Sequence, residues 1–246
     1  MTIAGIEVVI RILVLNLDFR EVSYHILSMT SNAERQQDRA IALLSLNGMA
    51  RLSELTDAGI TAATVSRMER KGGVVRLARG LYQLPDAPLD ANHSLAEAAK
   101  LVPKGVICLQ SALAYHDLTD RIPPSIWMAI GVKDWRPRIS SPPIQIMRFG
   151  PKEFESGIEE HVIEGVTVRI YGAAKTVIDM FHHHRRAKLL YPKSHNPSPT
   201  AAIEGLREVL RQRKTTPAEI ARYAVEAGTR TWELVRPYLE AYTLNG

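Results

Sequence analysis

Residues Gly48 to Pro85 read GMARLSELTDAGITAATVSRMERKGGVVRLARGLYQLP. A short helix over Arg51–Ala58 is followed by a turn at Gly59. A second helix runs from Thr61 to the Gly72-Gly73 pair, and an arginine-bearing hairpin covers Val74–Leu84. Two helices joined by a tight glycine turn can set the second one into a major groove. The order of these elements predicts a winged helix-turn-helix.

The second helix has an apolar inner face and a polar outer one. Thr61 stands at the N-cap position, where its hydroxyl can accept an unpaired amide hydrogen of the first turn. Val65 and Met68 are three residues apart and are predicted to point inward. Hydroxyls near the helix start suit base edges, and cations later in the helix suit phosphates. The side chains expected outward or on the flanks are Thr61, Thr64, Ser66, Arg67, Arg70 and Lys71.

The hairpin is predicted to be a basic wing. Arg76 and Arg79 flank a turn at Ala78-Arg79-Gly80, and a wing tip that carries arginine can enter a minor groove or contact phosphate. Arg51, at the start of the first helix, completes the predicted DNA-binding set. The alternative is a small helical bundle with an ordinary solvated face, because helix-turn-helix patterns are short and degenerate. The hairpin residues expected to pack inward are Val75, Leu77, Leu81 and Leu84.

Composition places the chain among ordinary globular proteins. It has 246 residues, of which 46% are hydrophobic and 23% charged, and its net charge of +5 permits a nucleic-acid partner without demanding one. The length is sufficient for two modest domains. A single cysteine, Cys108, excludes a disulfide framework within the chain and suits a reducing cytoplasm. We expect Cys108 to be a small buried hydrophobe in a cytoplasmic protein.

Residues 1–28 do not resemble the remainder. Ile3–Leu17 is almost wholly apolar but contains Glu7 and Arg11, so it is too short and too charged to span a membrane. It also lacks the features of a signal peptide. Because Met29 precedes a polar stretch and then a clean helix, we interpret 1–28 as an extension, with translation starting naturally at Met29. The alternative is an extra helix or strand that packs on the domain or on a partner.

The remaining pattern predicts an α+β chain with a winged domain at 29–88 and a mixed α+β domain at 91–246. The first helix is expected over Ala33–Leu46, with Ala40, Ile41, Leu43 and Leu44 as its buried stripe. A linker is expected at Asp86–Asn92 and a mobile loop at 189–200, LLYPKSHNPSPT. Strands are predicted at Ser125–Ile130 and Ile144–Phe149, and a hairpin at His161–Tyr171. The predicted helices are His93–Leu101, Gly105–His116, Ala173–Arg186, Thr200–Arg213, Pro217–Ala227 and Thr231–Tyr242.

Residues that could carry chemistry are few. His182, His183 and His184 are consecutive, so on a helix they point about 100° apart and cannot converge on one ion from a single helix. There is no phosphate-binding loop, nucleophile elbow or zinc signature, so we predict no metal, no cofactor and no enzymatic activity. Lys175 and Asp179 are four residues apart and can share a helix face with nearby Thr176. They form either a local ion pair or a polar contact surface.

The order of motifs resembles the AbiEi antitoxins of bacterial type IV toxin–antitoxin systems. The resemblance runs from about residue 33 to the C-terminus. Its middle motif, GVICLQSALAYHDLTDRIPPSIWMAIG at 105–131, is unusually specific. The flanking motifs are AGITAATVSRMERKGGVVRLARGLYQLP at 58–85, VRIYGAAKTVIDMFHHHRR at 168–186 and AAIEGLREVLRQRKTTPAEIARYAVEAGTRTWELVRPYLEA at 201–241. The sequence departs from the family after Phe181, where the 189–200 loop replaces a basic, glycine-containing lead into the next helix.

The resemblance implies a function for each domain. The winged domain would bind inverted repeats in operator DNA and repress its own operon. The second domain would counteract a nucleotidyltransferase-like toxin, often without a stable complex, and no membrane partner is implied. A stand-alone regulator with a ligand-sensing or dimerising second domain is the alternative, and a winged nuclease is a third hypothesis. The antitoxin surface is predicted at Lys175, Thr176, Asp179, Arg185 and Arg186.

Overall fold

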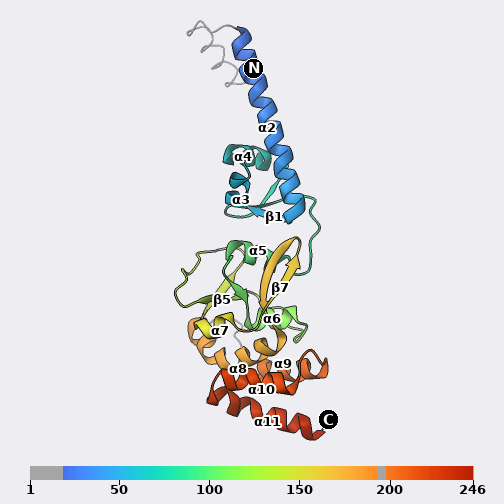
Figure 1. Cartoon of the computed structure of the whole chain (residues 1–246), viewed down its shortest axis with the longest axis vertical. Helices are drawn as coiled ribbons and strands as arrows, with labels where there is room; N and C mark the ends of the chain where they lie inside the picture. The colour runs from blue at the N-terminus through green and yellow to red at the C-terminus, as the bar shows by residue number, and fades with distance from the viewer. Residues whose placement is uncertain (1–18, 193–197, 246) are drawn as a thin grey trace.

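The computed structural model describes residues 19–192 and 198–245, and its fold is mixed α+β as predicted. Figure 1 shows three layers along the long axis: the winged segment, a five-stranded sheet, and a set of helices near the C-terminus. Residues 1–18 and 193–197 lie outside the described residues. Most of the predicted extension at 1–28 and the middle of the predicted loop at 189–200 therefore lie outside them too. Within the described ranges no helix is long and apolar enough to cross a membrane.

Helix α2 (Phe19–Asn47) begins well before the predicted Ala33 and continues through Met29 without a break. Its C-terminal half packs on the winged segment through Ala40 and Leu44, each 1% exposed. Ile41 was predicted to lie in the same stripe, but it is 44% exposed. Ala40 and Leu44 are four residues apart and share the buried face of the helix, whereas Ile41, next to Ala40, points away from it. Leu43 packs partly buried beside the stripe.

The winged segment follows the predicted order with one addition. The addition is a short strand, β1, which pairs with β3 and gives a sheet of order β1-β3-β2. The hairpin register differs from the prediction by one residue: Val74 is 3% exposed, whereas Val75 is 44% exposed. Leu81 is buried as predicted. The elements are β1 (Met49–Arg51), α3 (Leu52–Asp57), α4 (Ala62–Arg70), β2 (Val75–Ala78) and β3 (Leu81–Gln83).

The second sheet has the order β6-β5-β4-β8-β7, with parallel β5·β6 and β4·β8 pairs and antiparallel β4·β5 and β7·β8 pairs. The stretch 105–116 was predicted to be one helix, but it forms β4 (Val106–Ile107) and then α6 (Leu109–Tyr115). Cys108 lies between them and is fully buried, as expected. The other strands are β5 (Ile126–Gly131), β6 (Ile144–Phe149), β7 (Ile158–Ile163) and β8 (Val166–Tyr171).

Helices cover both faces of this sheet. In β5, Trp127 and Ala129 point to a core shared with the C-terminal helices, whereas Ile126 and Met128 point to a second core under α5. This alternation is the period-2 pattern of a strand that is buried on both faces. The helices are α5 (His93–Leu101), α7 (Pro151–Glu155), α8 (Ala173–Leu190), α9 (Pro199–Arg211), α10 (Pro217–Glu226) and α11 (Thr229–Asn245).

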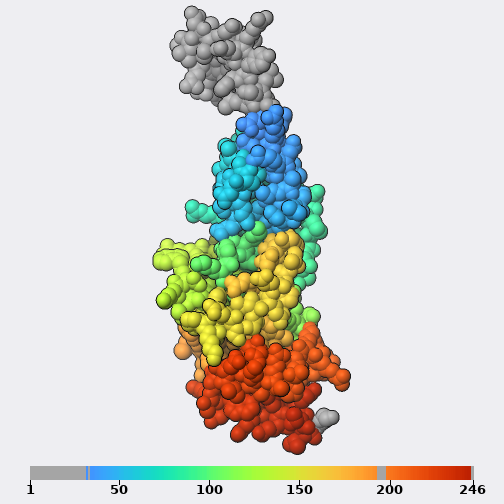
Figure 2. Space-filling model, viewed as in Figure 1, coloured from blue at the N-terminus to red at the C-terminus, as the bar shows by residue number. Residues whose placement is uncertain are grey.

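The winged segment and the second sheet are joined by a shared buried cluster, which we call the seam. Met49 of β1 and Leu81 of β3 belong to the same buried cluster as the apolar residues of α5 and β8. Figure 2 shows the yellow β7–β8 hairpin reaching the winged segment. At its tip, Glu164 accepts a hydrogen bond from the Asp90 amide at 2.6 Å and contacts His93 Nδ1 at 2.7 Å. The hairpin tip, the linker and α5 are therefore held together.

Candidate functional site

Helix α4 is fixed at its start by a network of hydroxyls. The hydroxyl of Thr61 accepts a hydrogen bond from the Thr64 amide at 3.3 Å, as the N-cap prediction required. The Thr64 hydroxyl donates to Gln36 Oε1 of α2 at 2.8 Å, and the Thr64 residue is only 2% exposed. The prediction that Thr64 faces outward is therefore wrong, because α2 covers that side of the helix. Thr64 positions α4 and is not available to a base edge.

The exposed face of α4 and the wing carry the predicted cations. Ser66, Arg70 and Lys71 are exposed on α4, and Arg67 is half-buried. Arg76 is exposed in β2, and Arg79 is exposed in the wing turn itself, beside Gly80, whose φ is 74°. In the part of the chain that the structure describes, no acidic side chain pairs with these arginines or with Lys71. Their charges are free to meet phosphates.

Arg51 occupies a different environment. It ends β1, where it pairs with Leu81, and it is the N-cap residue of α3. Its amide donates to Glu54 Oε2 at 2.6 Å, and the same carboxylate accepts from Lys100 Nζ of α5 at 2.9 Å. Arg51 is half-buried and comes from β1 and the start of α3, not from α4.

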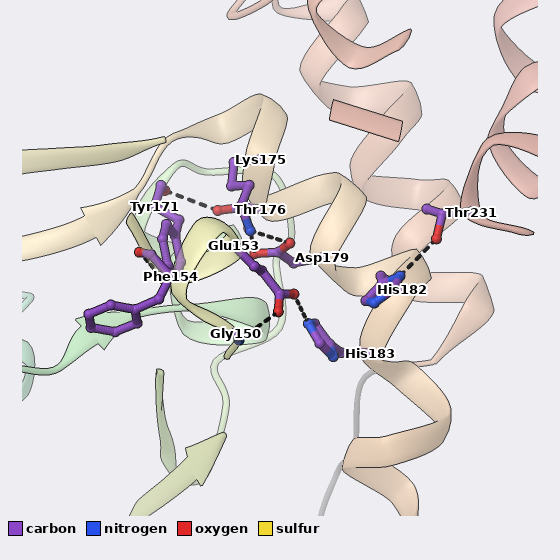
Figure 3. A network of polar contacts seen from close by, with 10 residues as sticks. All are labelled: Gly150, Glu153, Phe154, Tyr171, Lys175, Thr176, Asp179, His182, His183 and Thr231. Atoms are coloured by element: carbon purple, nitrogen blue, oxygen red, sulfur yellow. Dashed lines mark hydrogen bonds and ion pairs between the residues drawn. The ribbon is translucent and has the colours of Figure 1, made fainter. Parts of the chain in front are cut away.

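A buried polar centre lies where α8 begins (Figure 3). Lys175 Nζ donates to both oxygens of Asp179, at 2.5 and 2.6 Å, and also lies 4.6 Å from the centre of the Tyr171 ring. Thr176 donates to the Tyr171 carbonyl at 3.0 Å. The exposed fractions of Lys175, Thr176 and Asp179 are 4%, 0% and 2%. These residues were predicted to form a surface, and the structure corrects this: the sheet and the C-terminal helices enclose them.

Burial decides the electrostatics of this centre. It raises the pKa of Asp179 above its usual value, although the Lys175 charge and hydrogen bond oppose the change. It also raises the pKa of Tyr171, whose hydroxyl donates to the Phe154 carbonyl at 2.8 Å. Both changes follow from removing a charged form from water. Asp179 and Lys175 therefore compensate each other inside the domain.

Two histidines of α8 meet α7 next to this centre. His183, 3% exposed, donates from Nε2 to Glu153 Oε1, and its ring stacks on Phe149 with centroids 4.4 Å apart. His182 Nδ1 contacts the Thr231 hydroxyl at 2.8 Å. Burial alone would raise the pKa of Glu153, but the hydrogen bond and charge of His183 outweigh it and the pKa is lowered. For His182, burial and then the charge of His183 lower the pKa.

Sequence reasoning did not select Glu153. The signal that marks it is local: in Gly150-Pro151-Lys152-Glu153, proline starts a helix and the acid three residues after Gly150 caps it. The Glu153 Oε2 atom accepts from the Gly150 amide at 3.3 Å. The pairing with His183, thirty positions away, has no such signal.

Arg185 and Arg186 remain exposed, as the surface prediction requires. They line a pocket of about 460 Å³ between the end of α8 and the α10–α11 turn. Arg230 lines the same pocket, and Phe181 and Leu234 are among its apolar residues. Over residues 19–192 and 198–245 these three arginines have no ion-pair partner. The pocket therefore combines apolar walls with uncompensated positive charge.

Comparison with known proteins identifies the winged segment. A family model described as transcriptional regulator, AbiEi antitoxin, matches residues 38–85. No curated protein matches the chain. Among solved structures, the RV2827C protein from Mycobacterium tuberculosis is similar at a TM-score of 0.45 and 12% sequence identity, over 79% of this chain and 82% of that chain. The family match covers the winged segment, so the likeness to the AbiEi antitoxins applies to residues 38–85 of this chain.

Proposed function

We propose that this chain binds duplex operator DNA through α4 and the β2–β3 wing, and that it represses its own operon at inverted repeats. The observation that carries the proposal is the set of cations on both elements, which pair with no acidic side chain among the described residues, in a segment that matches the AbiEi family. Lysine and arginine that neutralise phosphates supply most of the affinity for DNA of any sequence. Arg67, in the middle of α4, is the candidate for reading a base, since Thr64 is covered by α2.

Replacing both wing arginines is expected to weaken DNA binding without changing its sequence preference. Each lost phosphate contact lowers the slope of log K against log salt by about 1, so the Arg76→Ala/Arg79→Ala protein should lose about 2. Fluorescence anisotropy at several salt concentrations measures both quantities on operator and random duplexes. The matched control is Arg207→Ala, an exposed arginine of α9 far along the chain. An unchanged slope in the double variant removes the wing from the interface.

Arg67→Ala serves as the contrasting variant in the same assay. A residue that hydrogen-bonds a base contributes about 1–3 kcal/mol of discrimination, so the operator should lose more affinity than random DNA. Equal losses of affinity for the two duplexes would indicate that Arg67 contacts the DNA backbone and not a base.

We further propose that the second domain counteracts a nucleotidyltransferase-like toxin in the cytoplasm without forming a stable complex. We expect it to act as a binding domain and not as an enzyme. The resemblance to AbiEi antitoxins supports the partner. The mutual pairing of Lys175 with Asp179 and of His183 with Glu153 supports a structural role for the buried polar groups. Because Lys175, Thr176 and Asp179 are buried, the residues that we propose to face the toxin are the exposed arginines Arg185, Arg186 and Arg230.

Loss of these arginines is expected to abolish antitoxicity while repression persists. In cells that carry the toxin gene, an Arg186→Ala/Arg230→Ala protein should fail to rescue growth, because the charges that line the pocket are removed. A reporter under the operator should stay repressed, and Arg207→Ala is again the matched control. Growth rescue equal to that of the parent would place the antitoxin surface elsewhere in the second domain.

A stand-alone ligand-sensing regulator is the second candidate, and one observation favours it. Gln83 is 3% exposed, and its Nε2 atom has no hydrogen-bond partner within the described residues. Gln83 lines a pocket of about 300 Å³ between the end of α2 and the β7–β8 tip. A small acceptor-bearing molecule could bind there. A nucleotidyltransferase gene beside this one favours the antitoxin, and its absence favours the sensor.

A further inference from the structure

The geometry points to a zinc site formed by Glu153, His182 and His183, which the proposed function does not use. Each residue offers one ligand atom, and these atoms lie within 4.8 Å of one another. Glu153 comes from α7 and the histidines from α8, so the packing of these two helices creates the cluster (Figure 3).

The cluster overcomes the geometric objection to consecutive histidines. Neighbouring helix positions point about 100° apart, so a helix alone cannot wrap three of them around an ion. His184 does not belong to the group whose ligand atoms meet among the described residues, and its Nδ1 contacts the Phe181 carbonyl of its own helix at 2.9 Å. The rings of His182 and His183 are 4.6 Å apart and perpendicular. Glu153 approaches both from α7, so the third ligand comes from outside the helix.

Each ligand is held in place by a second contact. Phe149 stacks on the ring of His183, and the Gly150 amide donates to the other oxygen of Glu153. Thr231 contacts His182 at Nδ1, which leaves Nε2 available to an ion. Histidines and carboxylates that bind metals are typically oriented by such outer hydrogen bonds. The cluster therefore has supported ligands before any ion arrives.

The surroundings admit a cation. The charge of Lys175 is compensated by Asp179, to which it is bonded. A pocket of about 190 Å³ opens beside the cluster and is lined by Glu153, Asp179, His182 and Glu226, with Lys152 and Lys175 as its basic residues. The pocket gives an ion access from solvent and leaves room for a water molecule as the fourth ligand.

The donor set fits zinc. Two imidazoles, one carboxylate and an open position are typical of Zn²⁺ sites with three protein ligands. Bonds of about 2.0–2.1 Å place tetrahedral donor atoms about 3.4 Å apart. Donor atoms that lie as much as 4.8 Å apart must therefore draw together by about 1.4 Å. The hydrogen-bonded atoms of His183 and Glu153 must instead move apart, and bonds to the ion replace their hydrogen bond.

Zinc titration of the full chain tests the site, with ZnCl₂ as the probe and a chromogenic chelator as competitor. The parent is expected to bind one Zn²⁺ per chain. Thr231→Val, which removes only the outer contact of His182, should weaken binding about 10–100-fold. Removal of a ligand, in His182→Ala or Glu153→Gln, should weaken it further. His184→Ala, the matched control on the same helix, should bind as the parent does.

The proposal fails if the parent binds no zinc, if His182→Ala binds as tightly as the parent, or if His184→Ala weakens binding equally. Circular dichroism of each variant shows whether it is folded, and His182 lies on the solvent side of α8, so its truncation leaves the core intact. Co²⁺ gives a second measurement. The parent should show the visible absorption of four-coordinate Co²⁺, and its persistence in Glu153→Gln would also overturn the assignment.

Discussion

An Asp179→Ala protein is expected to lose about 3–5 kcal/mol of unfolding free energy, because it leaves the Lys175 ammonium buried without a counter-charge. Lys175 is 4% exposed and lies against the faces of Tyr171 and Phe149, which cannot replace two charged hydrogen bonds. Urea denaturation followed by circular dichroism measures the change.

A double substitution provides the matched comparison. In Lys175→Met/Asp179→Leu both charges are replaced by apolar groups of similar size, and such replacements are often neutral or stabilising. We therefore expect the double variant to be more stable than Asp179→Ala. If the unfolding free energy of Asp179→Ala falls by less than about 1 kcal/mol, the Lys175 ammonium must reach solvent and the polar centre is not fully buried.

The same carboxyl predicts a dependence on pH. Burial raises the pKa of Asp179 in the folded protein. A carboxyl with a raised folded pKa contributes stability that is present below its unfolded pKa and is lost as the pH rises through the folded pKa. The stability of the parent relative to Asp179→Asn should accordingly fall as the pH rises above the usual aspartate range. A flat difference across that window would contradict the direction of the pKa change.

Gly48→Ala is expected to produce the other large effect, through the backbone. Gly48 has a φ of 66°, and a Cβ atom there would lie 1.7 Å from the Glu164 carbonyl oxygen. The methyl group and the hairpin tip cannot occupy the same space, so the tip must move away from the end of α2. The cost should exceed the about 1–2 kcal/mol that a left-handed backbone imposes on alanine.

Gly72→Ala distinguishes the effect of backbone strain from that of a steric clash with the hairpin tip. Gly72 has a φ of 74°, but nothing lies within 4 Å of a Cβ atom at that position. Its substitution therefore carries the backbone strain alone, and Gly48→Ala should be clearly the more destabilising of the two in urea. Hydrogen exchange at the Asp90 amide, which donates to Glu164, should accelerate only in Gly48→Ala. Equal losses of unfolding free energy in Gly48→Ala and Gly72→Ala would show that the hairpin tip moves away without destabilising the protein.

The sequence predicts the elements whose signals are local. Thr61 as an N-cap, Gly165 in the hairpin turn and the apolar periodicity of α9 and α10 each depend on residues a few positions apart. The strands β1 and β4 escape prediction, because their few residues become strands only by pairing with Gln83 and Ile170, far along the chain. Such pairing has no periodic pattern.

The candidate sites divide in the same way. Arg76 and Arg79 could be located, because a turn fixes their exposure. Thr64 could not, since the residue that covers it, Gln36, belongs to another helix. Lys175 and Asp179 have the spacing of a surface ion pair, and nothing in that spacing shows that helices and a sheet enclose both sides. Burial of polar groups is a property of the assembled layers.

The contacts between the winged segment and the second sheet limit how winged segments can be exchanged between related proteins. A winged segment transplanted from another regulator would need a residue without a side chain at position 48, and apolar residues where Met49 and Leu81 enter the shared core. It would also have to present an acid to Lys100, as Glu54 does. Under the proposed function, a new operator specificity is therefore easier to reach by changing Arg67 and its exposed neighbours on α4 than by replacing the winged segment as a unit.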